Sequence, residues 1–332
     1  MLTVLITGGA GYIGSHAVHS FLDAGYKVAV VDDLSTGVRE NLAAAAQLYK
    51  GDIADRGLLD AVLRQHPIDG VLHFAGSVVV PESLEDPGKY YRNNANRSLE
   101  LLDFLTLRGI KRFLFSSSAA VYGSPGSGTP VSEASHLNPI SPYGWSKLFV
   151  ERMIRDISAA TGLSYGILRC FNVAGFDPEG RTGQSTARAA RLVEVACEVA
   201  VGRRDSMRLY GTDHDTPDGT CVRDFVHVTD VARAHLATYE FLARSGRNAC
   251  FNCGSGEGHS VLEVIRAVEQ AHGRKLEVEP AARRPGDPPV LFADALAIRK
   301  TLGWHSQYGL ADMVCTTLAG ERHGQRDLIQ VP

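Results

Sequence analysis

The sequence has 332 residues, of which 44% are hydrophobic and 21% are charged, and its net charge is −3 at pH 7. This composition is typical of a globular protein and gives no electrostatic reason to expect nucleic acid or an anionic membrane as a partner. No apolar run approaches the ~20 residues of a membrane span, and a strand-like run at residues 2–6 leaves no room for a signal peptide, so we expect a cytoplasmic protein.

The first half of the chain alternates strand and helix signals. Short β-rich runs lie at residues 4–7, 28–32, 70–74, 112–116 and 165–169, with helix-length segments such as 98–107 between them. This alternation predicts an α/β fold, a doubly wound parallel Rossmann sheet whose ligands bind beyond the carboxyl ends of the strands. Beyond about residue 175 the pattern loosens into segments rich in Gly, Pro and Asp (175–183, 211–219 and 283–289), which are typical of binding loops. We expect a Rossmann domain at 1–174 and a smaller C-terminal α/β substrate-binding domain at 175–332, with parts of 220–250 returning to the first.

A glycine loop follows the first predicted strand. Gly8, Gly11 and Gly14 form a G-x-x-G-x-x-G pattern between this strand and a helix. Gly8 permits the tight turn, Gly11 lets the backbone approach a pyrophosphate, and Gly14 lets the helix pack closely on the sheet. The pyrophosphate faces the positive end of the helix dipole in this arrangement. The loop therefore predicts a dinucleotide site, with Tyr12 and Ile13 beside the cofactor.

Carboxylates after the next strands indicate which dinucleotide binds. Asp32 ends the second strand, and a carboxylate at that position takes the adenosine ribose hydroxyls, which favours NAD over NADP. Asp33 is a second candidate for the ribose or adenine contact. Asp52 and Ile53 follow a short strand at 48–50, where Asp52 either reaches the adenine amine or caps a helix at 55–65. The arginine nearest in sequence, Arg39, is expected on the surface.

Two further segments leave alternatives open. Phe74, Ala75 and Gly76 end the fourth strand, where the backbone passes close to the cofactor or the glycine serves packing alone. Cys250 and Cys253 form a lone C-x-x-C without a second pair to complete a zinc site. We interpret these cysteines as buried thiols in a reducing compartment, and we expect no metal site.

The residues with acid–base potential are Ser118, Tyr143 and Lys147. Residues 116–118 follow the strand at 112–115, and Ser141 and Pro142 are typical of a helix start. Tyr143 and Lys147 then lie one turn apart on one face of that helix. To act as a base near neutral pH, a tyrosine must lower its pKa from ~10 by ~3 units, or roughly 4 kcal/mol. A nearby lysine ammonium and a positive nicotinamide ring favour the phenolate, and Ser118 is placed to relay a proton.

These motifs together resemble the extended short-chain dehydrogenase/reductase family and, within it, the UDP-glucose 4-epimerase family. The resemblance runs over nearly the whole chain and includes residues 73–76, 90–94, 115–123, 141–147, 170–172 and 222–228. Related dehydratases and decarboxylases place an acidic residue just after the serine run, where this chain has Ala119 and Ala120. The resemblance therefore implies reversible hydride transfer at C4 of a UDP-sugar, with tightly held NAD.

The resemblance also implies roles for individual residues. Arg223 and Arg284 match the phosphate-binding arginines, Asp287 matches a uridine-ribose contact, Asn172 holds a substrate oxygen and Tyr210 lies against the uracil. Surface salt bridges and an Asx-turn are the alternatives for the arginines and the aspartate. The remaining implied contacts are Asn94, Ser116 and Phe171 for the cofactor, and Arg191, Leu192 and Arg208 for the substrate.

Four positions depart from the family pattern. Arg191 and Leu192 stand where many members have Asn-Leu, Val78 replaces a frequent lysine, and Cys170 replaces a tyrosine. Leu291 occupies the position that often gates substituents at C2, and its intermediate size leaves the sugar range open.

The expected reaction is the interconversion of UDP-galactose and UDP-glucose. The alternatives are 4-epimerisation of another UDP-sugar, N-acetylated or a pentose, and a non-catalytic NAD-binding sensor. Members of the family usually pair through two long helices, so the resemblance implies a homodimer through segments 98–107 and 147–159.

Overall fold

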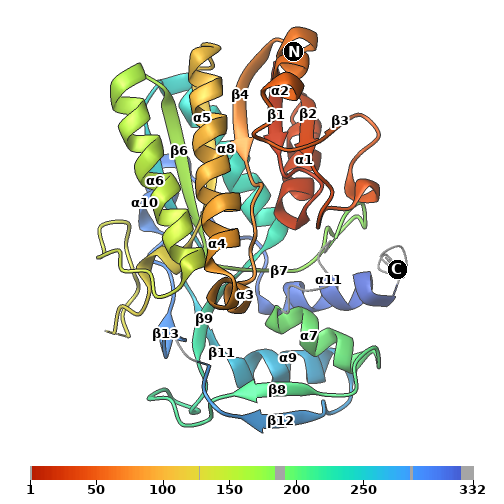
Figure 1. The fold of residues 1–332 in the computed structure, drawn as a ribbon. Helices are drawn as coiled ribbons and strands as arrows, with labels where there is room; N and C mark the ends of the chain where they lie inside the picture. The colour runs from red at the N-terminus through yellow and green to blue at the C-terminus, as the bar shows by residue number, and fades with distance from the viewer. Residues whose placement is uncertain (1, 127, 184–190, 285–286, 323–332) are drawn as a thin grey trace.

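A seven-stranded parallel sheet forms the centre of the computed structural model, which describes residues 2–126, 128–183, 191–284 and 287–322 (Figure 1). The strand order is β10-β6-β5-β4-β1-β2-β3, and every pairing in it is parallel. The strands are β1 (Thr3–Thr7), β2 (Lys27–Asp32), β3 (Gln47–Lys50), β4 (Ile68–His73), β5 (Arg112–Ser118), β6 (Ser164–Cys170) and β10 (Ala249–Cys253). The order reverses between β1 and β4, as in doubly wound folds, so the predicted fold class is confirmed.

Helices cover both faces of this sheet. Residues alternate between the faces along a strand, so Val4 and Ile6 of β1 enter one hydrophobic core and Leu5 enters the other. The first core holds α1 (Tyr12–Asp23), α8 (Val228–Ser245) and α10 (Leu296–Leu302), and the second holds α2 (Arg56–Gln65), α5 (Arg97–Leu107) and α6 (Pro142–Thr161). Short helical segments precede α5 and follow β2 and β5: η1 (Arg39–Asn41), α3 (Val80–Glu85), α4 (Pro87–Tyr90), η2 (Tyr91–Asn96) and η3 (Ala119–Tyr122).

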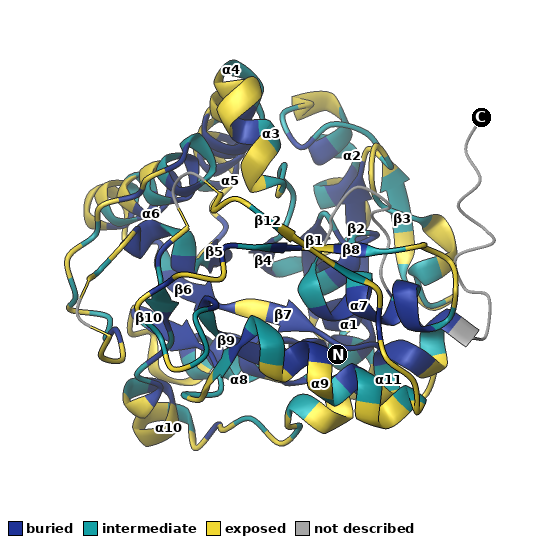
Figure 2. Cartoon of the chain, turned by 90° about the horizontal axis from the view of Figure 1, so that it is seen from below, coloured by how far each residue is buried: buried dark blue, intermediate teal, exposed yellow. Residues whose placement is uncertain are grey.

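A smaller α/β layer lies below the large sheet in Figure 1. It contains β7 (Asn172–Ala174), β9 (Val222–His227), β11 (Gly258–Ser260) and β13 (Val290–Leu291) in one sheet, and β8 (Met207–Tyr210) with β12 (Val278–Ala281) in another. The helices α7 (Leu192–Ala200), α9 (Val261–His272) and α11 (Leu310–Arg322) share a third hydrophobic core with β7, β8, β9 and β12. Viewed from below, Figure 2 shows the exposed yellow surface on outer helices such as α4 and α10.

The structure also corrects and extends the strand predictions. β5 runs to Ser118 rather than ending at residue 115 or 116, because Ser116, Ser117 and Ser118 pair with residues 168–170 of β6. In the segment 228–253, α8 packs on the large sheet and β10 is the strand at its edge, while β9 just before them belongs to the smaller layer. The domain division at residue 174 stays a prediction. In the part of the chain that the structure describes, no helix has the length and apolar character needed to cross a bilayer.

Candidate active site

One cavity of about 1200 Å³ opens beyond the carboxyl ends of the central strands. Its wall brings together the predicted cofactor, catalytic and substrate residues, with the single exception of Asn94. The predicted residues that line it are Gly8, Gly11, Tyr12, Ile13, Gly14, Asp32, Asp33, Asp52, Ile53, Phe74, Ala75, Gly76, Ser116, Ser118, Tyr143, Lys147, Phe171, Asn172, Arg191, Leu192, Arg208, Tyr210, Arg223, Arg284 and Asp287. A volume of this size accommodates more than one drug-sized ligand, whose pockets start near ~300 Å³.

The glycine loop is packed as the dinucleotide interpretation requires. Gly8 has a φ of +70°, and a Cβ there would lie 2.5 Å from the backbone nitrogen of Ala75. A Cβ on Gly14 would lie 2.1 Å from the carbonyl oxygen of Gly8, so this glycine permits the close approach of α1 to the loop. A Cβ on Gly11 would reach only the Gly8 carbonyl, at 3.3 Å, and would otherwise project into open space. The loop therefore leaves room for a pyrophosphate at the start of α1.

Asp32 has the free acceptor capacity that a ribose contact needs. Its side chain is buried, and its two oxygens accept hydrogen bonds from the backbone N–H groups of Ala10 and Leu34, each at 2.9 Å. A carboxylate offers about four lone-pair sites, so two remain for ribose hydroxyls. Burial raises the pKa of Asp32, and these two hydrogen bonds oppose that shift. Arg39 is exposed and does not line the cavity, as expected for a site without a 2′-phosphate contact.

The alternative role for Asp52 as a helix cap is wrong. Asp55 caps α2 instead, accepting hydrogen bonds from the backbone N–H groups of Gly57 and Leu58. Asp52 lines the cavity and forms a 2.9 Å ion pair with Arg97, so part of its acceptor capacity is already used. Asp33 is exposed and accepts two hydrogen bonds from Ser35.

Asn94 is the one predicted cofactor residue that does not line the cavity, and its direct contact with the cofactor stays a prediction. Its side chain is 2% exposed and forms two hydrogen bonds to the backbone of Ser77, at 2.7 and 2.9 Å, and one to Ser146 at 3.0 Å. Ser77 does line the cavity, with residues 78–81 that follow it. Asn94 therefore shapes the cavity by holding this segment.

Ser118, Tyr143 and Lys147 meet at the wall of the cavity. Ser141 caps α6 by accepting a hydrogen bond from the backbone N–H of Gly144, which confirms the predicted helix start. Ser118 accepts a hydrogen bond from the backbone N–H of Ala120, and its hydroxyl hydrogen-bonds Tyr143. The Lys147 ammonium lies 6.0 Å from the centroid of the Tyr143 ring and donates a 3.0 Å hydrogen bond to the Ser116 carbonyl.

The protein groups alone do not lower the pKa of Tyr143. Burial raises the pKa of Tyr143, and the hydrogen bond from Ser118 and the positive charge of Arg191 oppose this. Burial also lowers the pKa of Lys147 to about 8. The expected activation of the tyrosine by the lysine ammonium together with a nicotinamide charge stays a prediction, because the cost of burying the phenolate outweighs the protein groups that favour it.

The substrate end of the cavity contains arginines that contact other predicted site residues. The Arg223 guanidinium lies 3.4 Å from the carboxylate of Asp287 and donates a 2.9 Å hydrogen bond to the Val222 carbonyl. The Arg284 guanidinium lies 3.8 Å from the centroid of the Tyr210 ring and covers one face of it in a cation–π contact. The predicted contact of Tyr210 with the uracil would therefore use the other face of the ring. The salt bridge alternative is thus realised for Arg223, which still lines the cavity.

Two of the positions that depart from the family pattern, Arg191 and Leu291, lie in different surroundings, since Arg191 lines the cavity and Leu291 does not. The Arg191 guanidinium lies 4.6 Å from the centroid of the Tyr12 ring, and among the described residues its buried Nη1 has no hydrogen-bond partner. Leu291 does not line the cavity but packs in a small core with Val131, Phe171 and other residues. Any influence of Leu291 on the sugar therefore has to act through its neighbours.

Several cavity residues were not predicted from the sequence. Ser206 directly precedes β8 and Glu279 lies on β12, and the Ser206 hydroxyl donates a 2.6 Å hydrogen bond to Glu279. Arg97 enters from the start of α5. Arg97 lies close to residues 90–94, a segment that resembles the family, so the sequence offered a signal near it. Ser206 and Glu279 lie in no segment that resembles a known motif.

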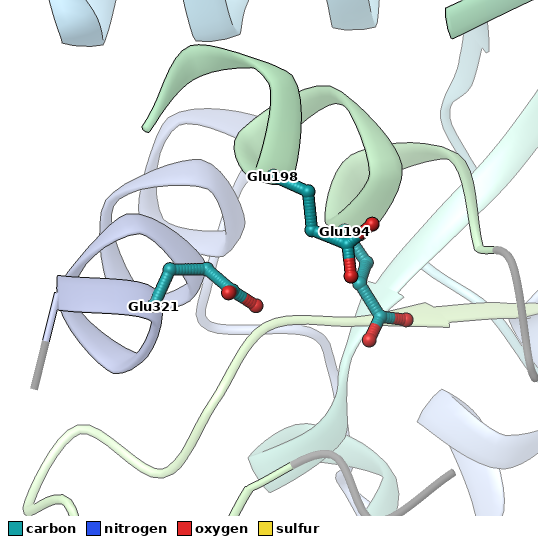
Figure 3. A group of neighbouring side chains, drawn as sticks. All are labelled: Glu194, Glu198 and Glu321. Carbon is teal, nitrogen blue, oxygen red and sulfur yellow. The ribbon is translucent and has the colours of Figure 1, made fainter. Parts of the chain in front are cut away.

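Three carboxylates outside the cavity form a separate cluster in which the ligand oxygens lie within 4.8 Å of one another (Figure 3). Glu194 and Glu198 belong to α7 and Glu321 to α11. Arg203 pairs with Glu321 at 3.0 Å, and Arg204 pairs with Glu198 at 3.0 Å. We interpret the cluster as an ion-pair link between the two helices, and it supplies no argument for a metal.

Glu321 makes the stability of the protein depend on pH. Burial raises the pKa of Glu321 to about 7, from an ordinary value of 4.5. Its contribution is therefore present below pH 4.5 and is lost as the pH rises through 7, since the buried carboxylate becomes charged. We expect Glu321→Gln to reduce the fall in unfolding free energy between pH 5 and pH 8 by about 1–2 kcal/mol, allowing for solvent screening. Urea unfolding at both pH values measures this, with the exposed Glu85→Gln as the control; equal pH slopes for Glu321→Gln and the native chain would contradict it.

Comparison with known proteins shows the family to which this chain belongs. Residues 4–254 match the model of the "NAD dependent epimerase/dehydratase family". A UDP-glucose 4-epimerase from Azospirillum brasilense is 52% identical over 320 residues, covering 96% of this chain and 92% of that protein.

Solved structures agree with this sequence similarity. A UDP-glucose 4-epimerase from Brucella ovis in complex with NAD superposes with a TM-score of 0.92 at 41% identity, covering 96% of this chain and 98% of that one. A UDP-glucose 4-epimerase from Stenotrophomonas maltophila with bound NAD and formylated UDP-arabinopyranose has a TM-score of 0.94 at 37% identity, covering 98% of this chain and all (100%) of the other.

Proposed function

Because the chain belongs to the NAD dependent epimerase/dehydratase family, we propose that it interconverts UDP-galactose and UDP-glucose by transient oxidation at C4. The observation that carries this proposal is that Ser118, Tyr143 and Lys147 line the same cavity as the glycine loop. Ala119 and Ala120 follow the serine, so no acid stands there to drive elimination or decarboxylation. A non-catalytic sensor would have no need for these three side chains.

The residues of the chain provide the acid–base steps. Tyr143 takes the proton of the C4 hydroxyl, directly or through the hydroxyl of Ser118, and returns it to the other face of the sugar. Lys147 is fixed by its hydrogen bond to the Ser116 carbonyl and stabilises the tyrosinate once it forms. NAD, when bound against the glycine loop and Asp32, supplies the hydride acceptor and donor and the positive charge that further favours the tyrosinate. Arg223 and Arg284 bind the diphosphate, for which the guanidinium fork is suited.

An assay of three UDP-sugars tests the proposed substrate. We expect turnover of UDP-galactose to exceed that of UDP-N-acetylglucosamine and UDP-xylose. Leu291 packs in a small core with Phe171, which lines the cavity, so the fit of a larger C2 substituent depends on Leu291 only through this neighbour. Negligible turnover of UDP-galactose beside rapid turnover of another UDP-sugar would establish the alternative, and no turnover of any would favour a sensor.

We also propose that the enzyme is cytoplasmic and forms a homodimer. The six cysteines are free thiols, which fits a reducing compartment. Exposed apolar side chains gather on α5 and α6 and just before α5, where Leu99 and Phe149 are 40% and 42% exposed. The Phe149 ring lies 5.9 Å from that of Tyr91 and 5.8 Å from that of Trp145. Such a patch is typical of a subunit interface.

A charge placed in this patch should separate the subunits. We expect Phe149→Glu to shift the molar mass in solution from a dimer to a monomer, because the interface would bury an unpaired carboxylate. Light scattering after size-exclusion chromatography measures the mass. Leu296→Glu is the matched control, since Leu296 is 47% exposed on α10, away from the patch. A dimer that persists in Phe149→Glu would place the interface elsewhere.

A further inference from the structure

Two cysteines lie side by side on neighbouring strands at the edge of the cavity, and one of them, Cys170, lines it. Cys170 ends β6 and Cys253 ends β10, and these neighbouring parallel strands pair them directly in register (Figure 2 shows the two strands side by side). Both side chains belong to the same hydrophobic core, so they point to the same face of the sheet. Adjacent strands lie about 4.8 Å apart, which falls within the ~4.4–6.8 Å between Cα atoms that a disulfide spans.

The partner of Cys253 is therefore not the cysteine next to it in the C-x-x-C sequence. Cys250 and Cys253 are three residues apart on one strand, and such residues face opposite sides of a sheet. Cys250 packs against the core that contains α5 and α6, whereas Cys253 lies in the core that contains α8. The thiols that hydrogen-bond each other are those of Cys170 and Cys253.

The two thiols differ in their surroundings. Cys170 lines the cavity, and its sulfur lies 3.8 Å from the hydroxyl of Ser116. A hydrogen bond from Cys253 lowers the pKa of the Cys170 thiol, burial opposes this, and the Ser116 hydroxyl and the Lys147 ammonium lower it further. The bond to Cys170 and burial raise the pKa of Cys253, which is fully buried. Cys170 is open to the cavity and Cys253 is not, which is the arrangement of a dithiol with one attacking and one resolving cysteine.

We infer that Cys170 and Cys253 form a redox-active dithiol that hydroperoxides oxidise to a disulfide in the wall of the active-site cavity. The Cys170 thiolate attacks one oxygen of the hydroperoxide, the O–O bond breaks, and Cys170 becomes a sulfenic acid as hydroxide or alkoxide leaves. The sulfur of Cys253 then attacks the sulfenic sulfur, its proton goes to the departing hydroxyl, and water is released. Two thiols lose two electrons, and hydrogen peroxide is reduced to two molecules of water.

The position of the dithiol connects it to the cofactor site. Phe171 and Asn172 follow Cys170 directly and line the cavity, and Ser116 contacts both Cys170 and Lys147. A covalent link between β6 and β10 would fix the start of this segment and remove the acidic thiol beside Lys147. Epimerisation does not use either thiol, so this chemistry is additional to the proposed reaction.

Peptide mapping after oxidation tests the inference without relying on activity. The purified protein with its bound nucleotide is treated with hydrogen peroxide, denatured, alkylated and digested, and the cross-linked peptides are identified by mass spectrometry. Cys315 is exposed and reports that the dose was sufficient. We expect a Cys170–Cys253 cross-link that dithiothreitol reverses.

Two variants make the result specific. Cys250→Ser should retain the cross-link, and Cys253→Ser should lose it and leave Cys170 as a sulfenic or sulfinic acid. If Cys170 and Cys253 both stay fully alkylated at a dose that oxidises Cys315, the inference is wrong. A cross-link between Cys250 and Cys253 would overturn it as well. Both of these outcomes are read in the native chain, so they stand even where a variant fails to fold.

Discussion

Replacing Tyr143 with phenylalanine is expected to lower kcat for UDP-galactose by roughly 10³-fold while NAD stays bound, because the variant lacks the group that moves the C4 hydroxyl proton. The ring remains to pack edge-on against Tyr90, whose centroid lies 6.3 Å away, and Lys147 keeps its hydrogen bond to Ser116. Initial rates with UDP-galactose measure kcat, and the absorbance of nucleotide released on denaturation measures bound NAD.

Tyr165→Phe provides the matched control for this experiment. Tyr165 is also nearly buried, with its hydroxyl 3.3 Å from Arg155, but it does not line the cavity. It should retain the native kcat. A Tyr143→Phe variant that keeps more than roughly a tenth of the native kcat would mean that another group removes the proton.

The electrostatics of the site explain why cofactor and tyrosine must act together. Burial raises the pKa of Tyr143, and Lys147, whose own pKa falls to about 8, is partly deprotonated at mildly alkaline pH. Among the described side chains, Arg191 is the one whose charge lowers the pKa of the tyrosine. The tyrosinate therefore needs positive charge from the nicotinamide as well, which links proton removal to the presence of oxidised cofactor.

The sequence predicts the parts of the fold and site that depend on short segments of chain. The glycine loop, Asp32 at the end of β2 and the Ser141 cap of α6 each follow from local backbone requirements, and the structure has all three as expected. The pair Tyr143 and Lys147 follows from helical spacing, which needs no knowledge of the tertiary fold.

The remaining features depend on contacts between distant segments. Asn94 is turned towards Ser77 and Ser146, and nothing in its own sequence neighbourhood distinguishes that from a cofactor contact. Cys253 pairs with Cys170, which lies 83 residues earlier (253 − 170), although the sequence presents Cys250 as its neighbour. Leu291 leaves the cavity wall because β13 pairs with β9 and directs it into a small core. Strand register and side-chain direction decide these cases, and both are set by the assembled sheets.

Arg191 is expected to have the second large effect, on substrate binding. We expect Arg191→Met to raise KM for UDP-galactose by about 10–100-fold, since a hydrogen bond to a charged group contributes ~1.5–3 kcal/mol. The guanidinium stacks on Tyr12, lines the cavity and keeps a buried Nη1 without a hydrogen-bond partner among the described residues. It also occupies the N-cap position of α7, where a cation opposes the helix dipole. A bound diphosphate would provide both the hydrogen-bond partner and the compensating charge.

This arrangement makes a stability measurement informative alongside the kinetics. Removing a buried guanidinium whose Nη1 has no hydrogen-bond partner among the described residues should leave the unfolding free energy unchanged or raise it, whereas removing a structural contact would lower it. Arg191→Lys should give an intermediate KM, because it keeps the charge without the guanidinium fork. Arg39→Met is the surface control and should leave KM unchanged.

The same variants distinguish the substrate diphosphate from the cofactor pyrophosphate as the anion that Arg191 binds. If the substrate is the partner, KM rises in Arg191→Met while the amount of NAD that co-purifies stays the same. If NAD is lost while KM for UDP-galactose holds in NAD-supplemented buffer, the guanidinium serves the glycine loop instead. A native KM combined with a lower unfolding free energy would reduce Arg191 to a packing residue on Tyr12. Arg191 contacts the ring of Tyr12, which follows Gly11 of the glycine loop, and its charge interacts with Tyr143. A substrate diphosphate bound to Arg191 would therefore neutralise the guanidinium charge beside both the cofactor loop and the catalytic tyrosine.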